Sequence, residues 1–115
     1  MSYICSMNTE KINSQMKKGV LEMCILAIIS EKDAYTSDII EKLKEQNLIV
    51  VEGTLYPLLS RLKKTDILDY YWVESPSGPP RKYFKLTDTG LEFYKELNKN
   101  WNELVETVAN ITSKK

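Results

Sequence analysis

The hydrophobic pattern of this 115-residue chain changes its period between residues 67 and 86. The segment ILDYYWVE, residues 67–74, is rich in aromatic and β-branched residues, and RKYFKL, residues 81–86, has a two-residue period. Both features are typical of β-strands. The intervening SPSGPP, residues 75–80, is turn-forming sequence. We therefore expect a β-hairpin with a six-residue tip.

Helical patterns lie on both sides of this hairpin. Apolar residues recur over a broad face from Asn13 to about Ser30, which predicts a largely buried first helix. The segment EKDAY interrupts that pattern, and Thr36 or Ser37 then offers an N-cap for a short second helix. After the hairpin, Thr87 is placed to cap a last helix that extends to about residue 111.

A third helix is predicted from about Gly53 to Thr65, although Pro57 lies within it. The leucines at 55, 58, 59 and 62 have the i, i+3, i+4, i+7 spacing of one helix face. Proline in a helix interior costs about 3 kcal/mol, but in or just after the first turn its missing amide has little or no partner to lose. We therefore interpret Pro57 as marking the start of a helix.

The resulting order is three helices, two strands and a helix, which describes a winged helix-turn-helix: a mainly α fold with a β-hairpin wing. We divide the chain into a flexible, irregular extension (residues 1–12), the winged helix-turn-helix domain (13–86), a dimerisation helix (87–112) and a tail (113–115).

Composition excludes several functional classes. The chain has no histidine, so it lacks the commonest general base and metal ligand, and it has no glycine-rich phosphate loop. Cys5 and Cys24 have no metal-ligand spacing, and Cys24 is predicted to be a small core residue. The longest apolar run, residues 24–29, is far too short to span a membrane. We expect a cytoplasmic protein that is not an enzyme and has no cofactor or metal.

The net charge of zero argues mildly against a nucleic-acid ligand, but the charges are unevenly distributed. Residues 60–64 and 81–85 each carry three basic residues and no acid. On a helical wheel, the face opposite the leucines of the third helix is small at its N-terminal end and basic further along. That layout suits a helix entering the major groove of DNA, although most basic stretches are only solvated surface. The hydroxyl-rich YTS, residues 35–37, begins the preceding helix, where amide groups can hold a phosphate.

Apolar residues in the last helix alternate spacings of three and four, which is the heptad pattern of helices that pack along their length. This predicts a homodimer interface, and packing against the first helix of the same chain is the alternative; both can occur. A two-fold dimer would present two recognition helices about 34 Å apart to a palindromic DNA site. The predicted interface residues are Tyr94, Leu97, Trp101, Leu104, Val108 and Ile111.

Two motifs in this chain resemble the PadR-type transcriptional regulators. EGTLYPLLSRL resembles the signature of that family, and RKYFKLTDTG resembles its wing strand and the start of its last helix. The single last helix suggests the shorter subfamily. The resemblance covers roughly residues 14–112 and implies a dimeric DNA-binding regulator, usually a repressor. It also implies DNA-facing roles for Tyr35, Thr36, Ser37, Gly53, Thr54, Tyr56, Pro57, Arg61, Lys64, Arg81 and Lys82.

The resemblance also suggests an effector site. In the short subfamily, a tryptophan at a place similar to Trp101 stacks against flat aromatic ligands, and Met16 or Val20 of the first helix would form the wall of such a site here. Trp101 as a simple interface aromatic is the alternative. The chain departs from the family pattern at Pro79 and Pro80, where relatives often have arginines, so contact of the wing with the minor groove is in question.

The sequence thus favours a homodimeric PadR-like repressor that binds double-stranded DNA and is released from it by a small aromatic or hydrophobic effector. The alternative is a winged helix used for protein contact without DNA binding. Such modules keep the hydrophobic pattern but lose the basic face. The basic residues that remain here are Arg61, Lys63, Lys64, Arg81 and Lys82.

Overall fold

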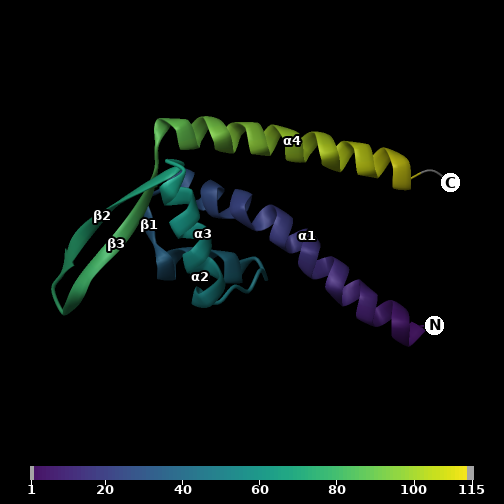
Figure 1. Ribbon diagram of the computed structural model, residues 1–115, viewed down its shortest axis with the longest axis horizontal. Helices are drawn as coiled ribbons and strands as arrows, with labels where there is room; N and C mark the ends of the chain where they lie inside the picture. Colours follow the sequence, from purple (N-terminus) through teal and green to yellow (C-terminus); the bar gives the residue numbers. More distant parts are fainter. Residues whose placement is uncertain (1, 114–115) are drawn as a thin grey trace.

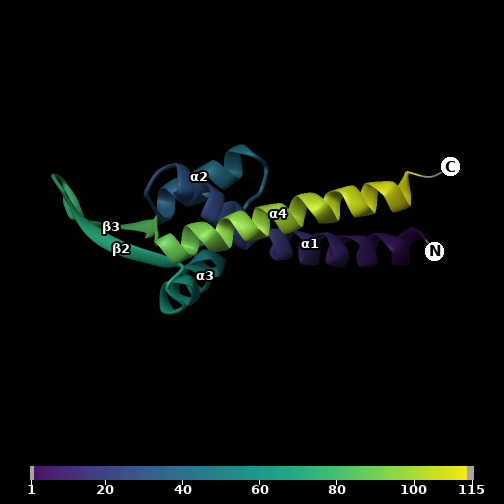
Figure 2. The same cartoon turned by 90° about the horizontal axis from the view of Figure 1, so that it is seen from above.

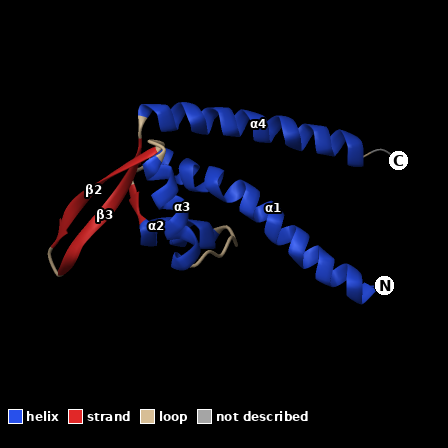
Figure 3. Ribbon diagram, viewed as in Figure 1, coloured by secondary structure: helices blue, strands red, loops and turns tan. Residues whose placement is uncertain are grey.

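The computed structural model describes the backbone of residues 2–113 and the side chains from residue 9 onward. The strands form one antiparallel sheet in the order β1-β3-β2. Figures 1 and 3 show this small sheet beside a group of short helices, from which two long helices project. The elements are α1 (Ser2–Glu31), β1 (Ala34–Tyr35), α2 (Thr36–Glu45), α3 (Glu52–Lys64), β2 (Leu68–Ser75), β3 (Gly78–Leu86) and α4 (Asp88–Thr112). The predicted fold class is confirmed.

We call residues 21–97 the head, because they surround one hydrophobic core. The core forms where the apolar faces of α1, α2 and α3 meet the base of the hairpin. Its buried apolar residues are Leu21, Ile25, Leu26, Ile29, Ala34, Ile39, Leu43, Leu55, Leu59, Leu62, Ile67, Leu68 and Phe84. This set includes three of the four leucines that defined the stripe of the third helix.

The ends of α2 and α3 are closed in the same way. Asn47 and Asp66 have positive φ angles of 65° and 64°, and asparagine and aspartate tolerate this left-handed conformation better than other non-glycine residues. In each case the next amide bonds back to a helical carbonyl: Leu48 to Leu43, and Ile67 to Leu62, both at 2.9 Å. These bonds satisfy carbonyls at the helix ends and turn the chain sharply.

The hairpin differs from the predicted one in its tip. Ser75 pairs with Gly78, so the six-residue tip was wrong and residues 76–77 alone form the turn. Pro79 and Pro80 lie inside β3, opposite an irregularity in β2 between Val73 and Ser75. Proline lacks the amide that a regular ladder needs, and it is tolerated at such a bulge beyond the reach of the two-residue β1.

Strand β1 was not predicted. Residues 34 and 35 lie in the segment that sequence analysis treated only as a break between helices. Ala34 pairs with Phe84, and Tyr35 pairs with Tyr83, so β3 becomes the central strand of the sheet. A two-residue strand leaves no periodic signal in a sequence, and the pairing arises from the tertiary fold.

The first helix was predicted too short and too buried. Helix α1 begins at Ser2, so the irregular structure expected over residues 1–12 was wrong for residues 2–12. Its side chains become buried only from Leu21 onward, and Met16 is 59% exposed. The apolar positions before Leu21 therefore do not contribute to the core of this chain.

The junction between hairpin and α4 was correctly predicted at Thr87. The Thr87 hydroxyl oxygen accepts a hydrogen bond from the Gly90 amide at 2.9 Å, and the hydroxyl donates to the Asp66 carbonyl at 2.6 Å. A Cβ at Gly90 would lie 2.0 Å from the carbonyl oxygen of Ile67. The lack of a side chain at Gly90 thus lets α4 start directly against the turn between α3 and β2.

We call residues 2–20 and 98–112 the arm. Figure 1 shows α1 and α4 leaving the same side of the head and diverging toward the two chain ends. In the orthogonal view of Figure 2, the axes of the two helices are nearly parallel and the chain runs along them in opposite directions, with α2 and α3 on opposite sides of them. Because the arm extends away from the head, the molecule is elongated, with principal extents of 58 × 32 × 24 Å.

Candidate nucleic-acid interface

Helix α3 presents a small, polar face away from the core. Gly53, Pro57, Ser60 and Lys64 are exposed and lie opposite the buried leucines. Pro57 is the sixth residue of the helix, so the prediction that its amide had almost no partner to lose was wrong. An amide at that position would bond to the carbonyl of Gly53, and proline cannot donate that bond. The loss falls on the outer face, where water can reach the carbonyl, and the helix continues to Lys64.

Thr54 and Tyr56 flank this outer face and are both exposed. Tyr56 lies on the side nearest the hairpin, where it borders a cleft between α3 and the wing. Arg61 lies on the other flank, where its guanidinium pairs with the Glu22 carboxylate of α1. The structure therefore turns Arg61 toward the first helix instead of the centre of the exposed face.

The start of α2 has a different chemistry from the predicted one. Tyr35, in extended conformation, is the N-cap residue, so the prediction of Thr36 or Ser37 at that position was wrong. The Asp38 carboxylate accepts a hydrogen bond from the Tyr35 amide at 3.4 Å. Thr36 is only 8% exposed, whereas Ser37 is exposed. Of the two hydroxyls in this turn, Ser37 is therefore the better placed to meet a phosphate.

One face of the wing carries a row of aromatic rings. Tyr71 stacks on Tyr83 with ring centroids 5.9 Å apart, and Tyr83 packs on Tyr35 at 5.3 Å. The guanidinium of Arg81 lies 4.9 Å from the ring centroid of Tyr35. The Tyr71 hydroxyl donates a 2.7 Å hydrogen bond to Asp33, and this bond raises the pKa of Tyr71. These contacts tie the wing to the segment between α1 and α2.

The other face of the wing surrounds Lys82 with aromatic rings. Its ammonium nitrogen lies 4.1 Å from the ring centroid of Tyr70, 5.6 Å from that of Phe84 and 5.8 Å from that of Trp72. Cation–π attraction of this kind holds a charged side chain in place without neutralising it. Lys82 is half-buried and faces the cleft beside α3, while Arg81 belongs to the opposite face of the hairpin.

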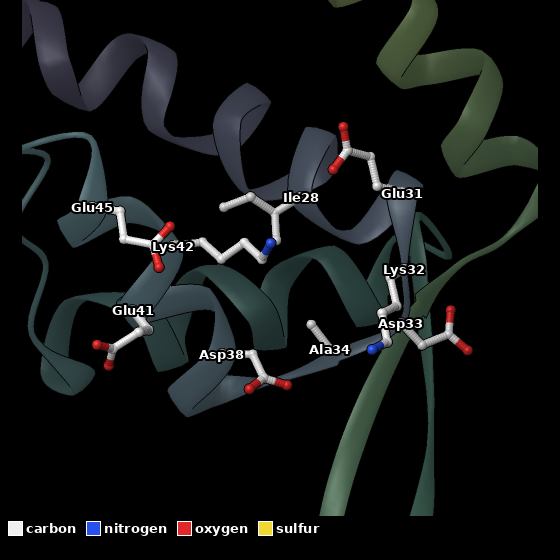
Figure 4. Close-up of a pocket in the computed structure, with 9 residues that line it drawn as sticks. All are labelled: Ile28, Glu31, Lys32, Asp33, Ala34, Asp38, Glu41, Lys42 and Glu45. Carbon is white, nitrogen blue, oxygen red and sulfur yellow. The ribbon is translucent and has the colours of Figure 1, made fainter.

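A second cleft, of about 230 Å³, lies between the end of α1, β1 and α2. Figure 4 shows carboxylate side chains on several sides of it. The lining residues are Ile28, Glu31, Lys32, Asp33, Ala34, Asp38, Glu41, Lys42 and Glu45. Five acids against two lysines make this cleft unfavourable for DNA. The exposed face of α3 and the hairpin remain as the surface whose charge suits a polyanion.

Comparison with known proteins identifies the family. The model of the PadR-like transcriptional regulator family matches residues 25–96, well over half of the chain. This chain is a PadR-like transcriptional regulator.

Solved structures of PadR-like regulators resemble this one over most of their length. A PadR-like transcription factor from Bacteroides fragilis is 60% identical, with a TM-score of 0.76 over 89% of this chain and 99% of that one. A PadR-like regulator from Bacillus cereus is 40% identical, with a TM-score of 0.79 over 88% and 99%. One from Eggerthella lenta is 26% identical, with a TM-score of 0.88 over 98% and 99%. An uncharacterised protein from Lysinibacillus sphaericus is 31% identical over 84% of this chain and 92% of its own.

This PadR-like chain is therefore a DNA-binding regulator of transcription and not an enzyme. Across the part that the structure describes, no group of three or more cysteines, aspartates and glutamates is arranged to hold a metal ion. No helix within residues 2–113 is both long and apolar enough to cross a membrane.

The predicted dimerisation residues of the PadR-like chain fall into two groups. Tyr94 and Leu97 pack against the core of their own head, as the alternative of packing within one chain required. The rest of the row stays uncovered: Trp101 is 39% exposed, Leu104 54%, Val108 48% and Ile111 63%. On α1, Met16 and Ile12 are exposed at 59% and 53%, and Val20 is half-buried. The heptad did not reveal Leu91, Phe93 and Val105, which are exposed on α4 as well.

Proposed function

We propose that this PadR-like regulator is a homodimeric repressor whose α3 helices enter adjacent major grooves of a palindromic operator. The observation that carries the proposal is the outer face of α3, where the backbone at Gly53 and Pro57 is exposed and a lysine stands at the C-terminal end. Residues without long side chains at the start of the helix allow close approach to base edges. Ser37 and the basic residues of the wing would then contact phosphates on either side.

The arm supports a dimer. It carries a row of apolar side chains that are about 40–60% exposed in the single chain, including Trp101 and Leu104. Such a row on two projecting helices is much larger than the scattered apolar residues of an ordinary surface. A two-fold partner that laid its own arm against this one would bury the row and fix the separation of the two heads.

A small aromatic or hydrophobic effector fits the same region. Trp101 is 39% exposed on α4, and Met16 and Val20 lie on the helix that accompanies it. A flat compound that bound among them in the dimer would alter the separation of the heads. Its effect on DNA affinity would be limited by the difference in its affinity for the two dimer conformations, the one that binds DNA and the one with the altered separation.

The DNA proposal is tested by a titration of purified protein against the DNA upstream of its own gene and a scrambled control. A dimer that neutralises about eight to ten phosphates predicts a log–log salt slope of roughly −7 to −9. Lys64→Ala should weaken binding, because Lys64 lies on the outer face of α3. Arg61→Ala should weaken it less, because the guanidinium of Arg61 is paired with Glu22.

Three results would change this proposal. Equal affinity of the wild type for both fragments would mean that the operator lies elsewhere, and no affinity for either would favour the protein-contact module. An unchanged affinity in Lys64→Ala and Arg61→Ala together would remove α3 from the contact surface.

The effector proposal is tested by tryptophan fluorescence. In a Trp72→Phe background, Trp101 is the sole tryptophan and reports on the arm alone. Titration with anilinonaphthalene sulfonate, a flat hydrophobic probe, should quench Trp101 and reduce operator binding in parallel. Unchanged Trp101 emission across this probe and a panel of flat aromatic compounds would contradict the effector site.

A further inference from the structure

We propose that the cleft between α3 and the wing is a binding site for a phosphate oxyanion. The phosphate can come from the DNA backbone or from a small phosphorylated molecule that competes with DNA. Only the DNA source rests on the function proposed above, because binding of a free phosphate needs no operator.

The cleft has a volume of about 220 Å³ and two unlike walls. Helix α3 forms one wall with Ser60, Lys63 and Lys64. The hairpin forms the other wall with Tyr70, Lys82 and Phe84. Three lysines and a serine thus line a space that also has aromatic residues in its walls. Lysine ammonium and hydroxyl groups are donors that suit phosphate oxygens.

Two of these ammonium groups lie over the same aromatic ring. The Lys82 nitrogen is 4.1 Å from the ring centroid of Tyr70, and the Lys63 nitrogen is 5.7 Å from it. The two nitrogens are therefore within about 10 Å of each other. One phosphate can bridge the two ammonium groups once lysine rotamer changes bring them close enough for a charge-assisted hydrogen bond of about 2.8 Å from each.

No acid offsets this charge. The lining includes no aspartate or glutamate, and within the described residues none of these three lysines forms an ion pair. The acidic cleft beside α2 has nearly the same volume and the opposite composition. Cation–π contacts orient Lys63 and Lys82 but leave their N–H groups available. A phosphate group, which has several acceptor oxygens and carries negative charge both in DNA and in a small monoester, is the ligand that would satisfy this arrangement. The aromatic wall would contact an organic group attached to it.

The first experiment is calorimetric titration of the full chain with inorganic phosphate and with phenyl phosphate at constant ionic strength. The site variant is Lys63→Gln with Lys82→Gln. The matched control is Lys42→Gln with Lys44→Gln, which removes the same charge from exposed positions on α2. We expect saturable binding of phenyl phosphate that weakens at least tenfold in the site variant and less than twofold in the control. Circular dichroism checks that each variant is folded, and Ser60→Ala with Lys64→Gln replaces the site variant if that one is not.

The second experiment measures operator affinity of the same variants over a range of salt concentrations. Loss of the one phosphate contact in each cleft should reduce the magnitude of the salt slope by about 0.9 per chain. If the slope falls but free phosphate does not bind, the cleft is a DNA phosphate site. If free phosphate binding is lost while operator affinity is unchanged, the ligand is a small molecule. If both respond, phenyl phosphate should also displace the operator.

The proposal is overturned if the site variant and the control give the same phosphate affinity and the same salt slope. A wild type that binds phenyl phosphate in the cleft but no DNA fragment would leave this inference standing while the proposed function failed. The two conclusions are therefore separable.

Discussion

The head and the arm share two helices, but the apolar residues of these helices are buried in the head and exposed in the arm. On α1, Ile25 is fully buried in the head, and Met16, nine residues earlier, is 59% exposed in the arm. On α4, Leu97 packs against the core while Leu104 is 54% exposed. Each of these helices thus continues from the head into the arm, although the residues that pack against it are present only in the head. The head is folded by its own core, and the arm has an apolar surface that its own chain leaves exposed.

Replacement of a core residue gives the largest expected effect. Ile25→Ala should lower the free energy of unfolding by about 2–5 kcal/mol, because it removes a fully buried side chain and leaves a cavity. Met16→Ala in the same helix should change it by less than about 0.5 kcal/mol in a monomeric chain. Urea denaturation at low protein concentration measures both. Equal losses would mean that the arm is part of the cooperative core.

Substitutions in the arm should change the affinity of the dimer and not the stability of the fold. Leu104→Ala is expected to weaken the proposed dimer by about 1–3 kcal/mol, since its side chain would become buried between subunits. Sedimentation equilibrium gives the dissociation constant. Ile49→Ala, at a residue that is 77% exposed on the head, is the control and should leave it unchanged. A Leu104 variant that associates like the wild type would place the interface elsewhere.

The junction between head and arm should show an intermediate effect. Thr87→Ala removes the N-cap of α4 and the hydrogen bond to the Asp66 carbonyl, with an expected loss of about 1 kcal/mol. Thermal denaturation followed by circular dichroism measures it, with Thr89→Ala in the same first turn as the comparison. Similar losses at the two threonines would show that the cap is not a significant contributor.

The ion pair between α1 and α3 should give the smallest effect. Glu22→Gln is expected to cost no more than about 1 kcal/mol, because the Arg61 side chain is 58% exposed and water screens the pair. Denaturation in low and in high salt measures it, and the difference between variant and wild type should shrink as salt rises. A loss above 2 kcal/mol would instead indicate a pair that strongly supports α3.

Sequence patterns predicted the elements whose signal is local. The leucines of α3, the cap at Thr87 and the strands of the hairpin each depend on a periodicity or on one residue type, and each was found at the predicted place within a few residues. The extent of α1 was missed because a polar stretch can be helical without an apolar face. The pairing of β1 with β3 was missed because it depends on residues about 50 positions apart.

The candidate site was harder to predict because it depends on side-chain direction. Sequence analysis placed Arg61 and Lys64 together on one basic face. The structure separates them, because Glu22, 39 positions earlier in the sequence, pairs with Arg61 and not with Lys64. Side-chain direction also decides the place of Lys63 and Lys82. The fold brings these two lysines from different elements to the one ring of Tyr70.

The pairing of β1 with β3 has a mechanical consequence. Residues 34–35 belong to the wing sheet, and α2 begins at the next residue, so the wing cannot tilt without carrying the start of α2 with it. In the proposed dimer, the spacing between the wing and α2 would therefore be fixed within each head, and the width of DNA that one head spans would be constant. Adjustment to different operators would then fall to the contact between the two arms, which sets the distance between half-sites and not the footprint on either one.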